Sequence, residues 1–381
     1  MHSITAIYLV TFFYAFHNAI PVYSESTFLE SLVPVSFIGF IYSIAAVISI
    51  LVTLNIGKLL VRFSNRSILI ASGISEGIFL LGIAFSPYTW LSVILFILKS
   101  VTLSVLFVSL NILVETVSQN KDTGKIRGVY LTILNIGIIT GPFFAALILN
   151  KGLHYLFFIS ALCLLPMIYV LIKHLAHTRE QKYITPHLYV GFNFLKKHRD
   201  VQIIVFAQYI LELFYTIMIV YGPLYLIENN ILNLQTYLGV VVPIILIPFI
   251  LIPYPLGRLA DNKLGEKELL VLGILLMIVG TSILALLNIS VLIFYIFALF
   301  IARLGASMVE EMASSYFYKQ VDHSQADLIS IFVNTRNLAL ISGPLIGSIV
   351  IYNFSLQTVF FVLVGVLVLS LLPILKLHDT K

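Results

Sequence analysis

Long apolar runs alternate with short polar stretches along the whole chain. Twelve of these runs are long enough to cross a bilayer as an α-helix, which needs about 20 mainly apolar residues. Their limits are residues 4–23, 34–60, 67–87, 89–117, 126–150, 153–173, 200–227, 235–257, 268–288, 290–317, 326–352 and 356–375. A helix satisfies its own backbone hydrogen bonds in hydrocarbon, and no run shows the strict alternation of a membrane β-strand. The pattern predicts an all-α integral membrane protein with twelve transmembrane helices.

The composition agrees with this pattern. Of the 381 residues, 60% are hydrophobic and 10% are charged, and the mean hydropathy is +1.05. A soluble protein typically has about 25% charged residues, so the main solvent of this chain is the lipid bilayer. The first run lacks a basic n-region and a small-residue cleavage site. We therefore expect it to be a retained span and not a signal peptide.

The cationic residues orient the predicted spans. The chain has 22 Lys and Arg residues. With the N-terminus inside, Lys151 lies outside and Lys99, Arg303 and Arg336 lie within spans. The rest fall in cytoplasmic loops or at cytoplasmic span ends, which is the known bias of membrane proteins. The sequence thus predicts a multi-pass protein of the cell membrane with both termini cytoplasmic, and the net charge gives no reason to expect a nucleic-acid partner.

No enzyme motif stands out. The stretch "GISEG" (Gly73–Gly77) fits the G-x-S-x-G pattern, but that pattern needs a strand-to-helix elbow and here it lies in an apolar helix. The sequence has no H-E-x-x-H, phosphate loop or CxxC, and the single Cys163 cannot form an intramolecular disulfide or a cysteine-rich metal site. We expect no catalytic residue, metal or cofactor.

The two halves of the chain resemble each other. "LNIGIITGPFFA" (134–145) aligns with "RNLALISGPLIG" (336–347), and Gly57 aligns with Gly257, at nearly the same offset. Chance matches of glycine, proline and asparagine in apolar helices are the alternative. The repeat predicts an N-terminal six-helix bundle over 1–172, a cytoplasmic central loop over 173–199 and a C-terminal six-helix bundle over 200–381.

The charged stretch "PLGRLADNKLG" (255–265) resembles the loop signature of the major facilitator superfamily. The matching positions in the second half are Gly257, Asp261, Gly265 and Lys267. The matching positions in the first half are Gly57, Arg62 and Arg66. Three positions depart from the signature: Asn262 stands where an arginine is usual, Val61 replaces the acid and Ser64 replaces the second glycine.

A second motif resembles the fifth-helix signature of exporters in this superfamily. It is "GIITGP" (137–142), although Ala145 and Ala146 replace the closing glycines. Glycine permits close helix contact and proline kinks a helix, so we expect a helix-packing role, for which ordinary packing is the simpler alternative. The residues concerned are Gly137, Gly141, Pro142, Gly343 and Pro344.

The resemblance implies a secondary transporter in which a small solute binds near the midplane and the halves rock to alternate access. The fifth-helix motif favours efflux by proton exchange. The alternative is a proton symporter that takes up a small organic anion or sugar, and a membrane sensor or intramembrane enzyme is a further alternative. The expected partners are lipid, a small-molecule substrate and protons, and the expected state is a monomer.

The charged stretch itself suggests a cytoplasmic latch. By the pseudo-symmetry of the family, Asp261 is expected near Lys125 and Arg127 at the start of the fifth span. In the other half the signs are exchanged, because Arg62 and Arg66 follow the second span while Asp322 and Asp327 flank the eleventh. The alternative is a solvated turn whose charges only set topology.

Polar side chains recur on spans 1, 4, 7 and 10, which line the central cavity in the resembling family. Those selected for a substrate or proton pathway are His17, Asn18, Lys99, Glu212, Tyr215, Arg303 and Glu310, with Arg336 from span 11. Burial disfavours a charged carboxyl, so Glu212 suits a proton carrier, and Arg303 is placed to hold Glu310 ionised. The alternatives are a packed histidine for His17, a structural ion-pair partner for Lys99 and for Glu76, and a hydrated mouth for Glu310 and Glu311.

Overall fold

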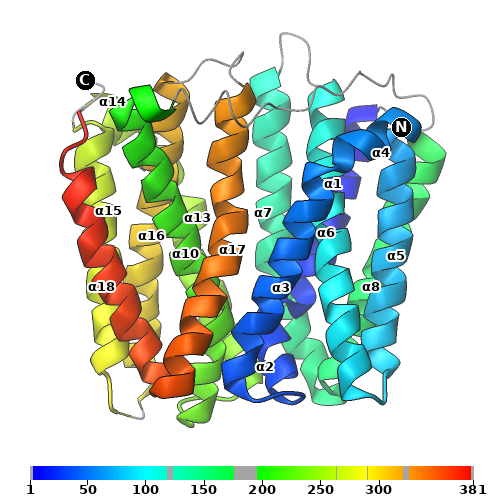
Figure 1. The fold of residues 1–381 in the computed structure, drawn as a ribbon, viewed down its shortest axis with the longest axis horizontal. Helices are drawn as coiled ribbons and strands as arrows, with labels where there is room; N and C mark the ends of the chain where they lie inside the picture. Colours follow the sequence, from blue (N-terminus) through cyan, green and yellow to red (C-terminus); the bar gives the residue numbers. More distant parts are fainter. Residues whose placement is uncertain are drawn as a thin grey trace. The chain divides into compact units, whose positions relative to one another are not determined.

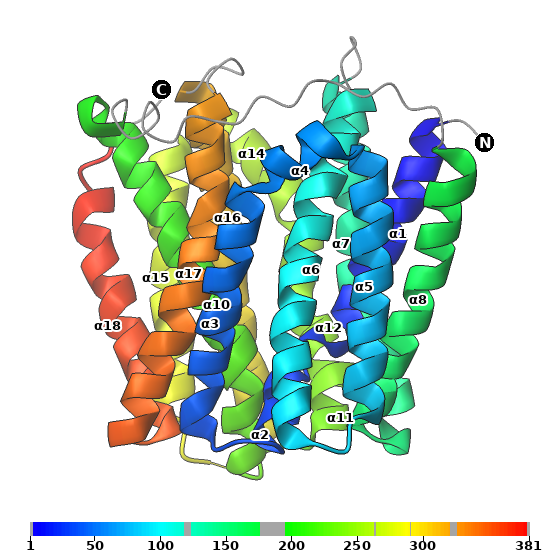
Figure 2. The same cartoon turned by 45° about the vertical axis from the view of Figure 1, so that its right-hand side comes forward.

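The computed structural model describes residues 3–117, 123–175, 195–262, 264–289, 291–320 and 326–378. Within these ranges the chain is almost entirely helical and contains no β-strand. Two compact units are present: unit 1 is Met1–Thr185 with Leu234–Val240, and unit 2 is Pro186–Asn233 with Val241–Lys381. In each unit the long helices run roughly side by side along one direction (Figures 1 and 2).

Unit 1 is built around helix α1. Its helices are α1 (Ser3–Val22), α2 (Glu25–Glu30), α3 (Val35–Leu54), α4 (Ile56–Arg62), α5 (Asn65–Phe85), α6 (Thr89–Val117), α7 (Thr123–Ile148), the 3₁₀ turn η1 (Leu149–Lys151), α8 (Leu153–His174) and the short α11 (Leu234–Thr236). Helix α1 packs on both α7 and α8, while α5 packs on α6 and α8. The short α11 packs on α7, where the Gln235 amide donates to the Ala146 carbonyl at 3.5 Å.

Unit 2 repeats this arrangement. Its helices are α10 (Arg199–Glu228), α12 (Val242–Leu246), α13 (Pro248–Leu251), α14 (Pro253–Asn262), α15 (Glu266–Leu286), α16 (Leu292–Gln320), α17 (Ala326–Asn353) and α18 (Leu356–Ile374). Helix α10 packs on α17 and α18 as α1 packs on α7 and α8, and α15 packs on α16 and α18 as α5 packs on α6 and α8. The same scheme of helix packing therefore occurs in both units.

Eleven helices in the described part of the chain are long and apolar enough to cross a membrane. The predicted span 326–352 is α17, 28 residues long, and it is not one of the eleven. The four polar residues 334–337 explain this, because they lower the hydropathy of the helix without interrupting it. Both units together form an all-α membrane fold.

Two predicted spans are broken in the structure. The span expected over 34–60 divides at Asn55 into α3 and α4. The span expected over 235–257 divides into α11, a π-helical turn (Tyr237–Val241), α12, α13 and α14. Pro243, Pro248 and Pro253 lie at or beside the starts of these pieces, and proline cannot donate the backbone hydrogen bond of a helix interior.

The charged stretch 255–265 is largely helical, which corrects the expectation of a turn there. Gly257 and Asp261 belong to α14, which continues to Asn262. The change of direction comes at Gly265, whose φ is 98°, and α15 begins at the next residue. Glycine takes this left-handed conformation without the steric cost that a Cβ brings.

Candidate functional site

A first polar cluster lies in unit 2, where α10 faces α16. Gln208, Glu212 and Tyr215 stand at i, i+4 and i+7 of α10, so one helical face carries all three. The Gln208 amide donates to Glu212 Oε1 at 3.2 Å, and the Tyr215 hydroxyl donates to Glu310 Oε2 of α16 at 2.7 Å. The structure thus brings together three of the residues selected from the sequence, Glu212, Tyr215 and Glu310.

Arg303 completes this cluster from α16. Its side chain is buried at 4% exposure, and its Cζ lies 5.4 Å from the Tyr215 ring and 5.8 Å from the Phe214 ring. A guanidinium over aromatic faces gains cation–π stabilisation. Its Nε has no hydrogen-bond partner among the described residues. The cluster therefore contains a buried cation that still has an unused donor.

Arg336 of α17 also acts on this cluster. The positive charge of Arg336 interacts electrostatically with the carboxyl groups of both Glu212 and Glu310. The positive charge of Arg303 interacts in the same way with Glu310. Glu212 is half-buried and Glu310 is exposed, as is Arg336. Two carboxyls and two guanidiniums therefore lie in one cluster. Glu212, Glu310 and Arg336 are accessible to a solute.

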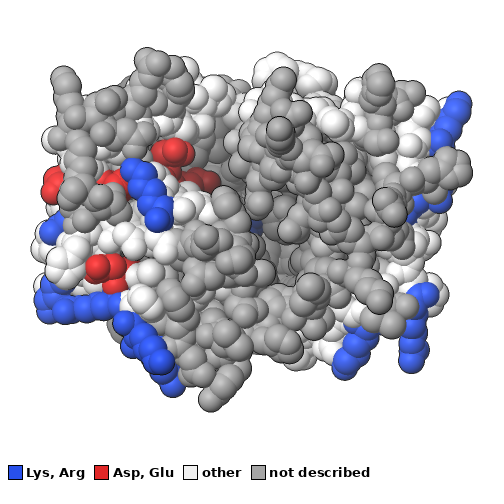
Figure 3. Space-filling model, turned by 90° about the horizontal axis from the view of Figure 1, so that it is seen from above, with Lys and Arg blue, Asp and Glu red and all other residues white. Residues whose placement is uncertain are grey.

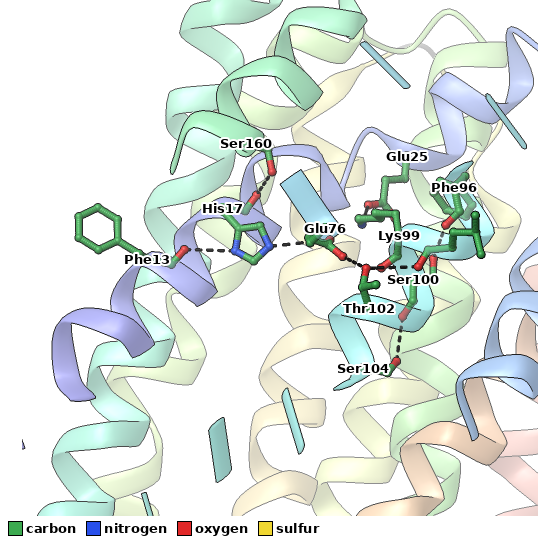
Figure 4. Close-up of polar contacts among 11 residues, drawn as sticks. Phe13, His17, Glu25, Glu76, Phe96, Lys99, Ser100, Thr102, Ser104 and Ser160 are labelled. Atoms are coloured by element: carbon green, nitrogen blue, oxygen red, sulfur yellow. Dashed lines mark hydrogen bonds and ion pairs between the residues drawn. The ribbon is translucent and has the colours of Figure 1, made fainter. Parts of the chain in front are cut away.

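A second polar cluster lies in unit 1 and is centred on two fully buried side chains (Figure 4). His17 of α1 and Glu76 of α5 are each 0% exposed, and His17 Nε2 lies 3.9 Å from Glu76 Oε1. The Thr102 hydroxyl of α6 contacts Glu76 Oε2, and the Ser160 hydroxyl of α8 donates to the His17 carbonyl at 2.7 Å. Four helices therefore meet at one polar group.

Lys99 lies one helical turn before Thr102, and its ammonium forms an ion pair with Glu25. Glu25 follows α1 on the short helix α2, and sequence reasoning did not select it. The available signal was weak: an acidic residue eight positions after His17 along the same segment. Asn18, which was selected, has its side-chain oxygen buried without a hydrogen-bond partner in the described part of the chain.

The gate-motif residues lie on helices of both units, and Arg66 has hydrogen bonds within unit 1. Arg66, at the start of α5, donates from Nε to the Leu171 carbonyl at 2.9 Å and from Nη2 to the Ile172 carbonyl at 2.7 Å. A cation on the last carbonyls of α8 suits the helix dipole. Gly57 and Arg62 lie in α4, and Lys267 lies in the first turn of α15.

Most side chains of the expected latch, both acidic and basic, lie outside the described part of the chain. Asp322 lies outside the described residues. The side chains of Lys125, Arg127, Asp261 and Asp327 also lie outside them, although their helices α7, α14 and α17 are described. The latch therefore stays a prediction.

The Gly-Pro motifs lie at close helix contacts in both units. A Cβ at Gly137 would come within 2.6 Å of the Ala15 Cβ, and one at Gly141 within 2.3 Å of the Ala19 Cβ, so α7 lies directly against α1. In unit 2, a Cβ at Gly343 would meet Thr216 at 3.2 Å. The Tyr221 hydroxyl donates to the Pro344 carbonyl at 2.6 Å. In each unit, these glycines position a helix that carries a polar cluster.

A family model described as Major Facilitator Superfamily matches residues 5–337 and 235–381. The chain belongs to the major facilitator superfamily. No curated protein matches its sequence. Among solved structures, this superfamily member is similar to the nucleoside transporter NupG, with a TM-score of 0.78, 13% identity and 100% of both chains covered. It is also similar to a bacterial homologue of the human lysosomal transporter Spinster, in an inward-facing and unoccupied conformation. There the TM-score is 0.75, the identity is 11%, and 99% of this chain and 96% of the other are covered.

These findings make the superfamily member a transporter of small solutes and not an enzyme. At such low identity the two solved structures support the fold alone. Within the described ranges, no group of three or more His, Cys, Asp or Glu side chains is arranged to hold a metal ion. The two polar clusters are the candidate functional groups that the described membrane helices present.

Proposed function

We propose that this chain is a secondary active transporter that exports a small organic solute in exchange for protons by alternating access. The observation that carries the proposal is the cluster of Glu212, Glu310, Arg303 and Tyr215 on facing membrane helices of unit 2. Ionisable groups within a membrane are costly and usually functional. Here two carboxyls share one cluster with a cation whose Nε is unused.

The cluster suits exchange because one carboxyl can serve two ligands in turn. An ionised Glu212 can accept a hydrogen bond from a solute or bind its positive charge. A protonated Glu212 has lost that charge and holds the solute less well. Binding of a proton and binding of the solute would therefore exclude each other, which is the logic of an antiporter. The two units would serve as the bodies that rock to expose the site on either side.

The alternative is proton symport, for which Arg303 is the supporting observation. Its unpartnered Nε could bind a carbonyl or an anionic group of the solute while Glu212 takes the proton. The structural likeness to NupG, which is named a nucleoside transporter, adds nucleosides to the solutes worth testing.

We also propose a monomer in the cell membrane with cytoplasmic termini. The distribution of charge in unit 1 supports the orientation of the termini. Helix α1 begins and α8 ends at the same face of unit 1. Lys58, Arg62, Arg66 and Lys173 lie toward this face, and Lys151 lies at the opposite ends of the helices. Figure 3 views this face, and exposed Lys and Arg side chains are visible on it.

The test is proton flux in proteoliposomes with a preset proton gradient. Organic cations, anions, sugars and nucleosides are added one at a time while lumenal pH is recorded. We expect one class to drive flux, and the sign of the flux separates exchange from symport. Glu212→Gln should reduce this flux to the level of empty liposomes. The matched control is Glu228→Gln, an exposed position at the end of the same helix, which should transport normally. Solute transport without any proton flux would contradict the proposal.

A further inference from the structure

The hydrogen bonds around His17 leave a gap that one hydrogen would fill. His17 Nδ1 lies 3.2 Å from the Phe13 carbonyl. A carbonyl only accepts, so Nδ1 carries the hydrogen of this bond. In a neutral imidazole the other nitrogen, Nε2, is then an acceptor. It faces Glu76 Oε1 at 3.9 Å, and neither atom has a hydrogen-bond partner in the described part of the chain. Without a further proton, two acceptors face each other in an apolar interior.

Thr102 limits where that proton can be. Its hydroxyl contacts Glu76 Oε2 and also lies 2.9 Å from the Lys99 carbonyl and 3.2 Å from the Leu98 carbonyl. A hydroxyl has a single hydrogen. If it donates to Glu76, the carboxyl can be ionised. If it donates to its own helix, the contact with Glu76 requires a hydrogen on Glu76 itself. The network therefore accommodates both protonation states of this carboxyl.

The charges around the pair favour one added proton. The Tyr14 ring of α1 lies 5.7 Å from the His17 ring, and Figure 4 shows the ion-paired Glu25 of α2 and Lys99 of α6 beside Glu76. Lys99 and Glu25 cancel each other, which leaves Glu76 as an unbalanced anion if His17 is neutral. From α8, the uncharged Ser160 hydroxyl donates to the His17 backbone carbonyl. A single proton makes the whole group neutral, and an unpaired buried charge is costly.

The pair also bridges helices that otherwise have little contact. Helix α1 packs extensively on α7 and α8, and α5 packs on α6 and α8, but α1 and α5 are not closely packed and α1 touches α6 only slightly. The close contacts of Gly137 and Gly141 fix the opposite side of α1 against α7. The polar bridge therefore crosses the loosest contact around α1. Figure 4 shows His17 and Glu76 pointing toward each other across this contact.

We infer that His17 and Glu76 form a proton-binding site inside unit 1, and that its proton holds α1 to α5 and α6. When the proton is present, Nε2 and Oε1 share it and the two helices are joined. When it leaves, two acceptors repel and α1 is released on this side. The site deepens the proposed function, on which its role in transport rests, because it is a second proton site apart from the carboxyls of unit 2. Helix α1 also carries Tyr14 and Asn18, so the proton controls the placement of a predicted substrate-binding face.

The test reads the proton directly and needs no transport. The ¹⁵N resonances of His17 are recorded in the full chain in lipid nanodiscs and are identified by their loss in His17→Gln. We expect the Nε2 resonance to move as pH is varied, because binding of the proton changes the charge of the imidazole. In Glu76→Gln the movement should disappear, and in the control Glu212→Gln it should remain. The protection of α1 amides, with the intrinsic pH dependence of exchange removed, should fall as pH rises in the wild type and should be independent of pH in Glu76→Gln, whose amide can donate to neutral Nε2.

An Nε2 resonance that is independent of pH, or that is the same in wild type and Glu76→Gln, would overturn the inference. If Glu76→Gln does not fold, Thr102→Val takes its place, because it removes the hydroxyl on Oε2 and must shift the midpoint of the His17 titration. An unshifted midpoint would count against the site. If the His17 resonance depends on pH but no proton flux is found, the proposed function is wrong and the proton site stands. If proton flux is found but the His17 resonance does not depend on pH, the proton site is wrong and the proposed function stands.

Discussion

At the scale of single residues, Lys99 and Glu25 form a buried ion pair in unit 1. Lys99 is 2% exposed and lies over the Phe96 ring at 5.8 Å, and Glu25 is 5% exposed. Taking two charges out of water is costly, and their attraction offsets the cost only while both are present. Removing one member of the pair therefore costs more stability than the intact pair contributes.

This asymmetry gives a stability prediction. Lys99→Met leaves Glu25 as a buried unpaired charge and should lower the free energy of unfolding by about 3–5 kcal/mol. Adding Glu25→Gln to Lys99→Met should recover most of that loss. Thermal or denaturant unfolding in detergent measures both variants. Lys173→Met, at an exposed lysine of α8, is the control and should change little. A double variant as unstable as Lys99→Met would show that the pair is not what Lys99 stabilises.

Sequence reasoning selected Lys99 but not Glu25, for a physical reason. A charge inside an apolar run is visible because the bilayer penalises it, which is how His17, Glu76, Lys99 and Glu212 stand out. Glu25 lies beyond the apolar run, in a stretch that reads as an ordinary loop with a second acid, Glu30. Only the turn of α2 after α1 decides which acid returns to the membrane interior, and that turn depends on tertiary packing.

At the scale of helices, glycines decide which pairs come together. A Cβ at Gly141 would lie 2.6 Å from the backbone carbon of Ala19, and a backbone atom cannot rotate away. Helices α1 and α7 are therefore in contact over their main chains, as small residues permit between membrane helices. In contrast, Gly365 on α18 has nothing within 4 Å of the position that a Cβ would take.

These two glycines form a matched pair for mutation. Gly141→Ala should destabilise the protein by about 1–3 kcal/mol, because an extra methyl group in a filled contact forces the helices apart. Gly365→Ala should be neutral or slightly stabilising, since alanine is the better helix former by about 1 kcal/mol. Unfolding temperature in detergent compares the two variants. Equal effects would mean that α1 and α7 have room to separate.

The helices that the sequence predicted are present, but their interruptions were missed. Apolar runs identify spans because hydropathy averages over many residues. The breaks at Asn55 and around Pro248 do not lower that average, since the chain on both sides stays apolar. The helical course of α14 was missed for the opposite reason. Its charges suggested a turn, whereas a helix leaving the membrane can carry charges on its last turns.

At the scale of the whole molecule, the chain divides into two units with the same helix-packing scheme but not into two continuous segments. The boundaries lie between Thr185 and Pro186, between Asn233 and Leu234 and between Val240 and Val241. The repeat in the sequence indicated two halves. It did not predict that Leu234–Val240 packs with the first half, because the hydropathy of a segment does not indicate which helices it packs against.

This division predicts the behaviour of split proteins. Two fragments divided between Thr185 and Pro186 should assemble when expressed together and recover transport, because the cut lies at the boundary between the two units. A cut after Gly141, within α7, should abolish assembly, because it opens a membrane helix and leaves backbone groups unsatisfied. Solute uptake into cells or vesicles measures both. Equal activity of the two splits would contradict the division into units.

The same division has a consequence for synthesis. A ribosome makes the chain from its N-terminus, and domains generally fold as they emerge. Leu234–Val240 is made only after α10, the first long helix of unit 2. Unit 1 therefore emerges with a place on α7 still vacant, and the segment that fills it arrives behind a helix of the other unit. The two bundles mature in an interleaved order, and the nascent first half remains open until the second half has begun.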